Sequence, residues 1–152
     1  MKTTKRLDAA LEKLYTAFHN NTLNAECCIN CAAGNICNNT DSWKHFSDDH
    51  GSLQLNYVGL VHENLGRRFQ GYKPSELLQI EMEFLRGCGY SIPLNYKSRR
   101  PKNPASKETL FNGLTAVITY LCVLDNVKSV MDYAPLFTNA QNFISHSEFA
   151  TS

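Results

Sequence analysis

Four of the six cysteines of this 152-residue chain lie within one stretch of eleven residues. Cys28, Cys31 and Cys37 have the spacing C-x2-C-x5-C, and Cys27 directly precedes them. A fifth cysteine, Cys88, stands between two glycines far along the chain. Thiolates are soft ligands for zinc and for iron–sulfur clusters, both of which usually take four protein ligands. A metal centre in this chain would therefore require a fold that brings residue 88 against the earlier cysteines.

Apolar residues recur at helical spacing on both sides of the cysteine-rich stretch. The sequence therefore predicts an all-α fold, a single domain of about five helices spanning residues 1–152. A cysteine-rich loop at 26–38 and a basic, proline-containing loop at 91–106 connect these helices. The expected helices cover 6–20, 43–46, 52–65, 74–87 and 107–124, with a shorter helical piece near 130–137.

The charge balance and hydropathy of the chain exclude several classes of partner. Fifteen basic residues against 14 acidic ones leave a formal charge of +1, which argues against nucleic acid or an anionic membrane. No segment approaches the roughly 18 uninterrupted apolar residues of a membrane span. The N-terminal stretch lacks the apolar core of a signal peptide, so we expect a cytoplasmic, reducing location. There, clustered cysteines are more often ligands or redox centres than structural disulfides.

Three hypotheses account for the cysteines. The first is an iron–sulfur cluster held by Cys28, Cys31, Cys37 and Cys88, with Cys27 as a substitute ligand. Small residues after Cys31 would let backbone N–H groups approach the sulfur atoms and tune such a cluster. The second hypothesis is a non-catalytic interaction module with a structural zinc, held by Cys28, Cys31, Cys37 and either Cys88 or a histidine. The third is free or redox-active thiols, in a thiol-based enzyme or sensor that uses Cys27 or Cys28. The alternative histidine ligands are His45, His50 and His62.

Other chemistry-bearing residues are expected to have structural roles. Cys122 falls on the apolar face of the 107–124 helix, so we expect it to pack in the core. The same expectation holds for four aromatic residues, Trp43, Tyr57, Tyr72 and Phe84. The chain has no phosphate-binding glycine loop, no dinucleotide fingerprint and no nucleophile elbow. The sequence thus identifies no catalytic residues and defines no oligomeric state.

Four segments carry a resemblance to a known family. They are Glu26-Cys27-Cys28-x-x-Cys31-Ala32, Asn39 to His45, Gly51 to Val61, and Gly87-Cys88-Gly89-Tyr90. From its first helix to about Phe137 the chain is similar to short Bacteroidetes proteins that are named as the F component of the sodium-translocating NADH–quinone reductase.

The resemblance implies a redox association. It does not extend to sodium transport, flavin binding or NADH oxidation, because the chain is too short for two reductase lobes and shows no anchor. We therefore expect an iron–sulfur protein in an electron-transfer accessory role. Such a protein would serve a redox partner and an oxidoreductase, and would not be a stand-alone enzyme.

Overall fold

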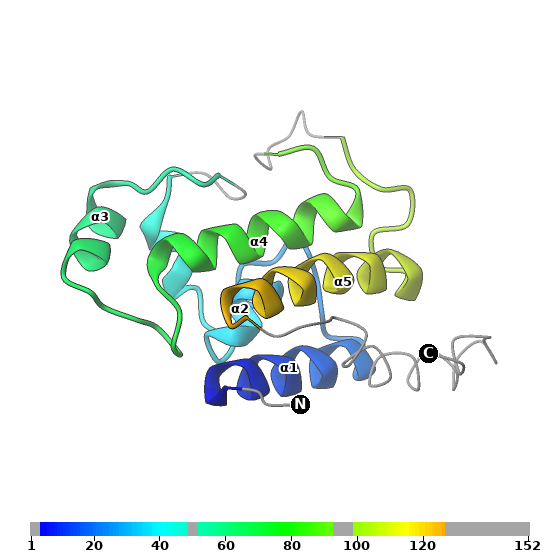
Figure 1. The fold of residues 1–152 in the computed structure, drawn as a ribbon. Coiled ribbons are helices and arrows are strands. Elements are labelled where there is room, and N and C mark those ends of the chain that lie inside the picture. The colour runs from blue at the N-terminus through cyan, green and yellow to red at the C-terminus, as the bar shows by residue number, and fades with distance from the viewer. Residues whose placement is uncertain (1–3, 49–51, 93–98, 127–152) are drawn as a thin grey trace.

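A computed structural model describes residues 4–48, 52–92 and 99–126 of the chain. The described part is helical and contains no named strand, which confirms the all-α prediction (Figure 1). The expected helical piece near 130–137 lies outside the described residues. The elements, in chain order, are α1 (Lys5–His19), α2 (Ala32–Ile36), the 3-10 helix η1 (Ser42–Phe46), α3 (Tyr57–Asn64), α4 (Pro74–Cys88) and α5 (Lys107–Leu124).

Side chains at the helix starts explain where the long helices begin. Thr4 caps α1, because its hydroxyl accepts the Leu7 N–H at 3.1 Å. Ser106 caps α5 through Thr109 N–H in the same way, at 3.1 Å. Pro74 opens α4, where its missing N–H costs nothing. These local signals are visible in the sequence, and α5 has the predicted bounds.

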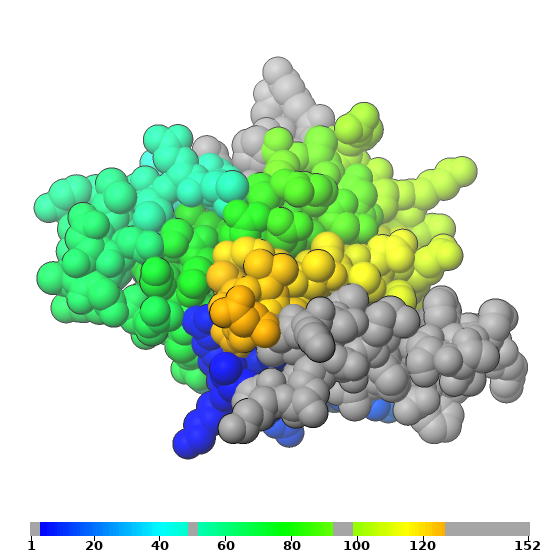
Figure 2. Space-filling model, in the orientation of Figure 1, coloured from blue at the N-terminus to red at the C-terminus, as the bar shows by residue number. Residues whose placement is uncertain are grey.

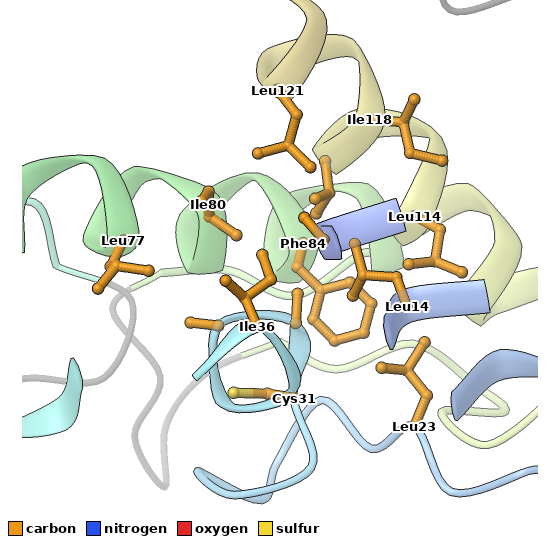
Figure 3. Packing of buried hydrophobic residues seen from close by; sticks show 14 of the residues in the cluster. Leu14, Leu23, Cys31, Ile36, Leu77, Ile80, Phe84, Leu114, Ile118 and Leu121 are labelled. Carbon is orange, nitrogen blue, oxygen red and sulfur yellow. The ribbon is translucent and has the colours of Figure 1, made fainter. Parts of the chain in front are cut away.

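Helices α4 and α5 run side by side and share the most extensive contact between any two elements (Figure 1). They approach closely at Gly113, where a Cβ atom would lie 2.4 Å from the Cys88 sulfur and 2.8 Å from the Phe84 ring. Phe84 lies at the centre of the core, near Leu114 of α5 and Leu14 of α1 (Figure 3). Burial of such large apolar side chains supplies most of the driving force for folding.

One arginine joins three separate parts of the fold. The Arg6 guanidinium, at the start of α1, donates to the Gly71 carbonyl at 2.7 Å and, through Nε, to Asp125 at 2.8 Å. It also lies over the Tyr72 ring, 4.6 Å from the centroid. Arg6 therefore links the start of α1 to the loop before α4 and to the end of α5.

Helix α3 differs most from expectation. The pattern predicts a helix over 52–65, but α3 begins at Tyr57 because the Asn56 side chain caps it, accepting Gly59 N–H at 2.9 Å. The helix forms a projection at one end of the molecule (Figure 2). Tyr57 is 81% exposed, so its assignment to the core is wrong. The other residues expected in the core, Trp43, Tyr72, Phe84 and Cys122, are buried.

Within the described part of the chain, no helix combines the length and apolar character that crossing a membrane requires.

Candidate functional site

The first cysteines form a tight turn that leads into helix α2. The N–H groups of Asn30 and Cys31 both donate to the Cys27 carbonyl, at 3.1 and 2.9 Å. Cys31 is the N-cap of α2, and its sulfur accepts the Gly34 N–H at 3.3 Å. A Cβ atom on Gly34 would lie 2.4 Å from the carbonyl oxygens of Cys28 and Ile29, so this close approach requires glycine. The predicted loop therefore contains a short helix that includes Gly34.

Side chains from the surrounding elements hold this cysteine turn, residues 27–31, in place. The Trp43 indole N–H, from η1, donates to the Cys28 carbonyl at 2.9 Å. The Asn35 amide donates to the carbonyls of Asn30 and Cys31, each at 2.9 Å. These carbonyls are therefore satisfied although the turn lies against the core, and two side chains, from η1 and α2, fix its backbone.

The two thiols of the C-x2-C pair differ in access. Cys28 is half-buried, whereas Cys31 is fully buried at the edge of the core (Figure 3). The Cys31 thiol donates to the Cys28 carbonyl at 3.5 Å. The two cysteines therefore stand three residues apart in one tight turn.

A buried carboxylate lies against this pair. Glu81 projects from the middle of α4 and has no solvent exposure. One of its oxygens accepts the Ala33 N–H at 3.3 Å, two residues after Cys31 at the start of α2, and its charge raises the pKa of the Cys31 thiol. Glu81 is not among the site residues that the sequence predicts. The signal was present, because Glu81 interrupts an apolar helical stripe that includes Leu77, Leu78, Phe84 and Leu85.

The environment keeps the nearby thiols protonated. Burial, followed by the charge of Glu81, raises the pKa of Cys31 well above its ordinary value. Burial raises the pKa of Cys28, and the positive charge of Lys44 partly opposes this effect. Burial and then Glu81 raise the pKa of Cys88 to about 12. Three of the predicted ligands are therefore neutral thiols, and the negative charge of Glu81 raises the pKa of each of them.

Cys37, the fourth predicted ligand, has different surroundings. It ends α2, and its thiol has Ser42 and Lys13 as its polar neighbours. Across residues 4–48, 52–92 and 99–126, no group of three or more His, Cys, Asp or Glu side chains is placed to hold a metal ion. The iron–sulfur cluster and the structural zinc therefore stay predictions.

The alternative histidine ligands have separate surroundings. His45 is exposed and lies 3.8 Å from Asp41. His62 packs its ring edge-on against Phe46 and Phe69, with centroids 5.6 and 5.4 Å away. His50 lies outside the described residues. Packing against aromatic rings gives His62 a structural role.

The end of the basic loop contacts the residue that precedes the cysteines. Arg100 lies 3.4 Å from a Glu26 carboxylate oxygen, and the other oxygen accepts the Tyr90 hydroxyl at 2.9 Å. Tyr90 follows Gly89, the C-cap of α4, so Glu26 ties both the basic loop and the end of α4 to the cysteine turn. The fold thus places residues 26, 90 and 100 together.

No protein-family model, no curated protein and no solved structure matches this chain. The family resemblance therefore also stays a prediction, and the functional argument depends on the geometry of the cysteine turn and Glu81.

Proposed function

We propose that this protein is a thiol–disulfide redox protein in which Cys28 and Cys31 alternate between two thiols and one disulfide. The observation that carries the proposal is the asymmetry of the pair. Cys28 is half-buried and accessible to a partner, while Cys31 is buried three residues later and hydrogen-bonded to the Cys28 carbonyl. An accessible attacking thiol followed by a protected resolving thiol is the arrangement that thiol–disulfide exchange uses.

The exchange has two steps. The Cys28 thiolate attacks one sulfur of a partner disulfide, the partner S–S bond breaks, and one partner thiol leaves. The Cys31 sulfur then attacks the Cys28 sulfur of this mixed disulfide and displaces the second partner thiol. Overall, the partner disulfide gains two electrons and two protons, and the protein gains one disulfide.

The raised thiol pKa values support a direction for this reaction. Strongly oxidising dithiol proteins stabilise the thiolate of their reduced form. Here burial raises the pKa of both Cys28 and Cys31, so the reduced form has no stabilised thiolate. The pair is therefore expected to act as an electron donor. This proposal keeps the redox role that the sequence suggests and assigns it to thiols.

The test is mass spectrometry of the reduced protein after exposure to oxidised glutathione. We expect a loss of two hydrogen atoms and a disulfide that links Cys28 and Cys31 within one peptide. The variants C28S and C31S should lose this product, and C122S, at a buried thiol of α5, should retain it. Iron, zinc and acid-labile sulfide are measured on the same protein after anaerobic purification. A stoichiometric metal that disappears in both C28S and C31S would overturn the proposal in favour of a metal centre.

A further inference from the structure

A fully buried carboxylate requires a reason, because ionised groups are costly to remove from water. Glu81 has no exposed surface, lies on the face of α4 that packs against α2, and is flanked in sequence by two buried residues, Ile80 and Met82. The Ala33 N–H at the start of α2 donates to it at 3.3 Å, and the next N–H, of Gly34, donates to the Cys31 sulfur at 3.3 Å. Glu81 is therefore held against the resolving thiol of the pair.

Resolution of a mixed disulfide requires Cys31 to lose its proton. The nucleophile in thiol–disulfide exchange is the thiolate, and burial together with Glu81 raises the pKa of Cys31 well above its ordinary value. Cys31 has no solvent exposure, so bulk water has no direct access to its proton. The buried Glu81 carboxylate and the Cys31 sulfur accept neighbouring N–H groups at the start of α2, so Glu81 is the group positioned to take that proton.

We infer that Glu81 is the catalytic base that accepts the Cys31 proton as the Cys28–Cys31 disulfide closes. This inference rests on the proposed thiol–disulfide function. In the step, the Cys31 S–H bond breaks and the proton moves to the Glu81 carboxylate. The Cys31 sulfur donates its electron pair to the Cys28 sulfur, the bond between Cys28 and the partner sulfur breaks, and the partner leaves as a thiolate. Atoms and charge balance, because Glu81 becomes neutral as the partner sulfur becomes negative.

Other ionisable groups share this environment and affect the design of the test. The charge of Glu81 raises the pKa of Cys28 and Cys31 in the cysteine turn and of Cys88 in its own helix. Lys44 in η1 lowers the pKa of Cys28, whereas Glu81 raises it. Removing the Glu81 charge should therefore have opposite effects on the two steps. The attack by Cys28 should not slow, and the attack by Cys31 should slow.

Single-turnover reaction with the aromatic disulfide dithiobis(nitrobenzoate) separates the two steps. With protein in excess, the attack by Cys28 releases the first coloured thiol and the attack by Cys31 releases the second. All proteins carry C27S, which removes the neighbouring half-buried thiol. We expect E81Q to release the first thiol at least as fast as its parent and the second at least about tenfold more slowly. C31S should lack the second phase, and C88A, which leaves Glu81 and Cys31 in place, should retain both.

The pH dependence distinguishes a base from a merely structural contact. In E81Q, hydroxide or buffer must take the Cys31 proton, so the second phase should accelerate about tenfold per pH unit between about pH 7 and pH 9. The parent should respond less steeply, and E81D, which keeps the carboxylate, should recover part of its rate. Circular dichroism verifies that E81Q is folded, and E81M, which replaces the carboxylate by an apolar side chain of similar length, provides the same comparison if E81Q is not. If the second phase of E81Q keeps the parental rate, the role of Glu81 as a base is overturned and the proposed thiol–disulfide function stands. Absence of a second phase in the parent overturns the proposed function.

Discussion

The buried thiol of Cys88 predicts a specific loss of stability at alkaline pH. This side chain is 5% exposed and lies against the backbone of Gly113 in α5. Burial, then the charge of Glu81, raises its pKa from 9.0 to about 12. In the folded protein the thiol keeps its proton up to about pH 12, while in the unfolded chain it loses that proton near pH 9. The stabilising contribution is therefore fully present below about pH 9 and falls as the pH rises towards 12.

The size of the effect follows from the same two pKa values. One pKa unit corresponds to about 1.4 kcal/mol, so the full loss between the two values is on the order of 4 kcal/mol. Between about pH 8 and pH 10 only part of this window is crossed, and the Cys88 contribution falls by about 1.4 kcal/mol. Urea unfolding of the wild type and of C88A, both kept reduced, measures this difference.

The comparison between the two proteins isolates the thiol from other titrating groups. We expect C88A to lose about 1.4 kcal/mol less than the wild type between these two pH values. Val117→Ala, at a buried α5 side chain without a titrating group, should lower the free energy of unfolding at both pH values and keep the wild-type pH dependence. Identical pH dependence in the wild type and C88A would refute the reasoning, because the Cys88 thiol would then titrate equally in the folded and unfolded chain.

Two further substitutions test the packing around the site and the fold. Gly34→Ala should lower the free energy of unfolding by about 1–3 kcal/mol and accelerate alkylation of Cys28, because the new Cβ meets a backbone oxygen 2.4 Å away. Unchanged urea unfolding would contradict the close approach. Arg6→Ala should cost about 1–3 kcal/mol by removing the donor to the buried Asp125 carboxylate. The control Arg68→Ala, at a half-exposed ion pair, should change the free energy of unfolding by less than about 1 kcal/mol. Equal losses of unfolding free energy in the two variants would contradict the assigned role of Arg6.

Local signals allowed the long helices to be predicted from the sequence. Pro74 and Ser106 act on the backbone next to them, so the starts of α4 and α5 depend little on the rest of the chain. The start of α3 was missed because Asn56, which caps it, stood inside a segment whose apolar spacing also fits a longer helix. Tyr57 was misassigned because helical spacing is the same for a face that packs and a face that projects into solvent.

The candidate site was only partly predictable. The spacing of Cys28 and Cys31 indicated a tight turn, which the structure contains, but spacing does not determine which sulfur caps a helix and which reaches the surface. Glu81 was overlooked because a single charged residue in an apolar stripe is usually solvated at the edge of the face. Its burial depends on α2 packing against α4, a tertiary contact between segments far apart in the chain.

The hydrogen bond from Trp43 to the Cys28 carbonyl also gives the molecule an optical reporter. Trp43 is the only tryptophan in the chain, and it is buried with its indole N–H directed at the backbone of the cysteine turn. Indole emission responds to nearby sulfur and to changes in hydrogen bonding, so we expect a rearrangement of this turn to alter the fluorescence excited beyond the tyrosine absorption band, which Trp43 alone contributes. The chemistry of the cysteines is therefore observable in the unlabelled protein, in real time and at low concentration.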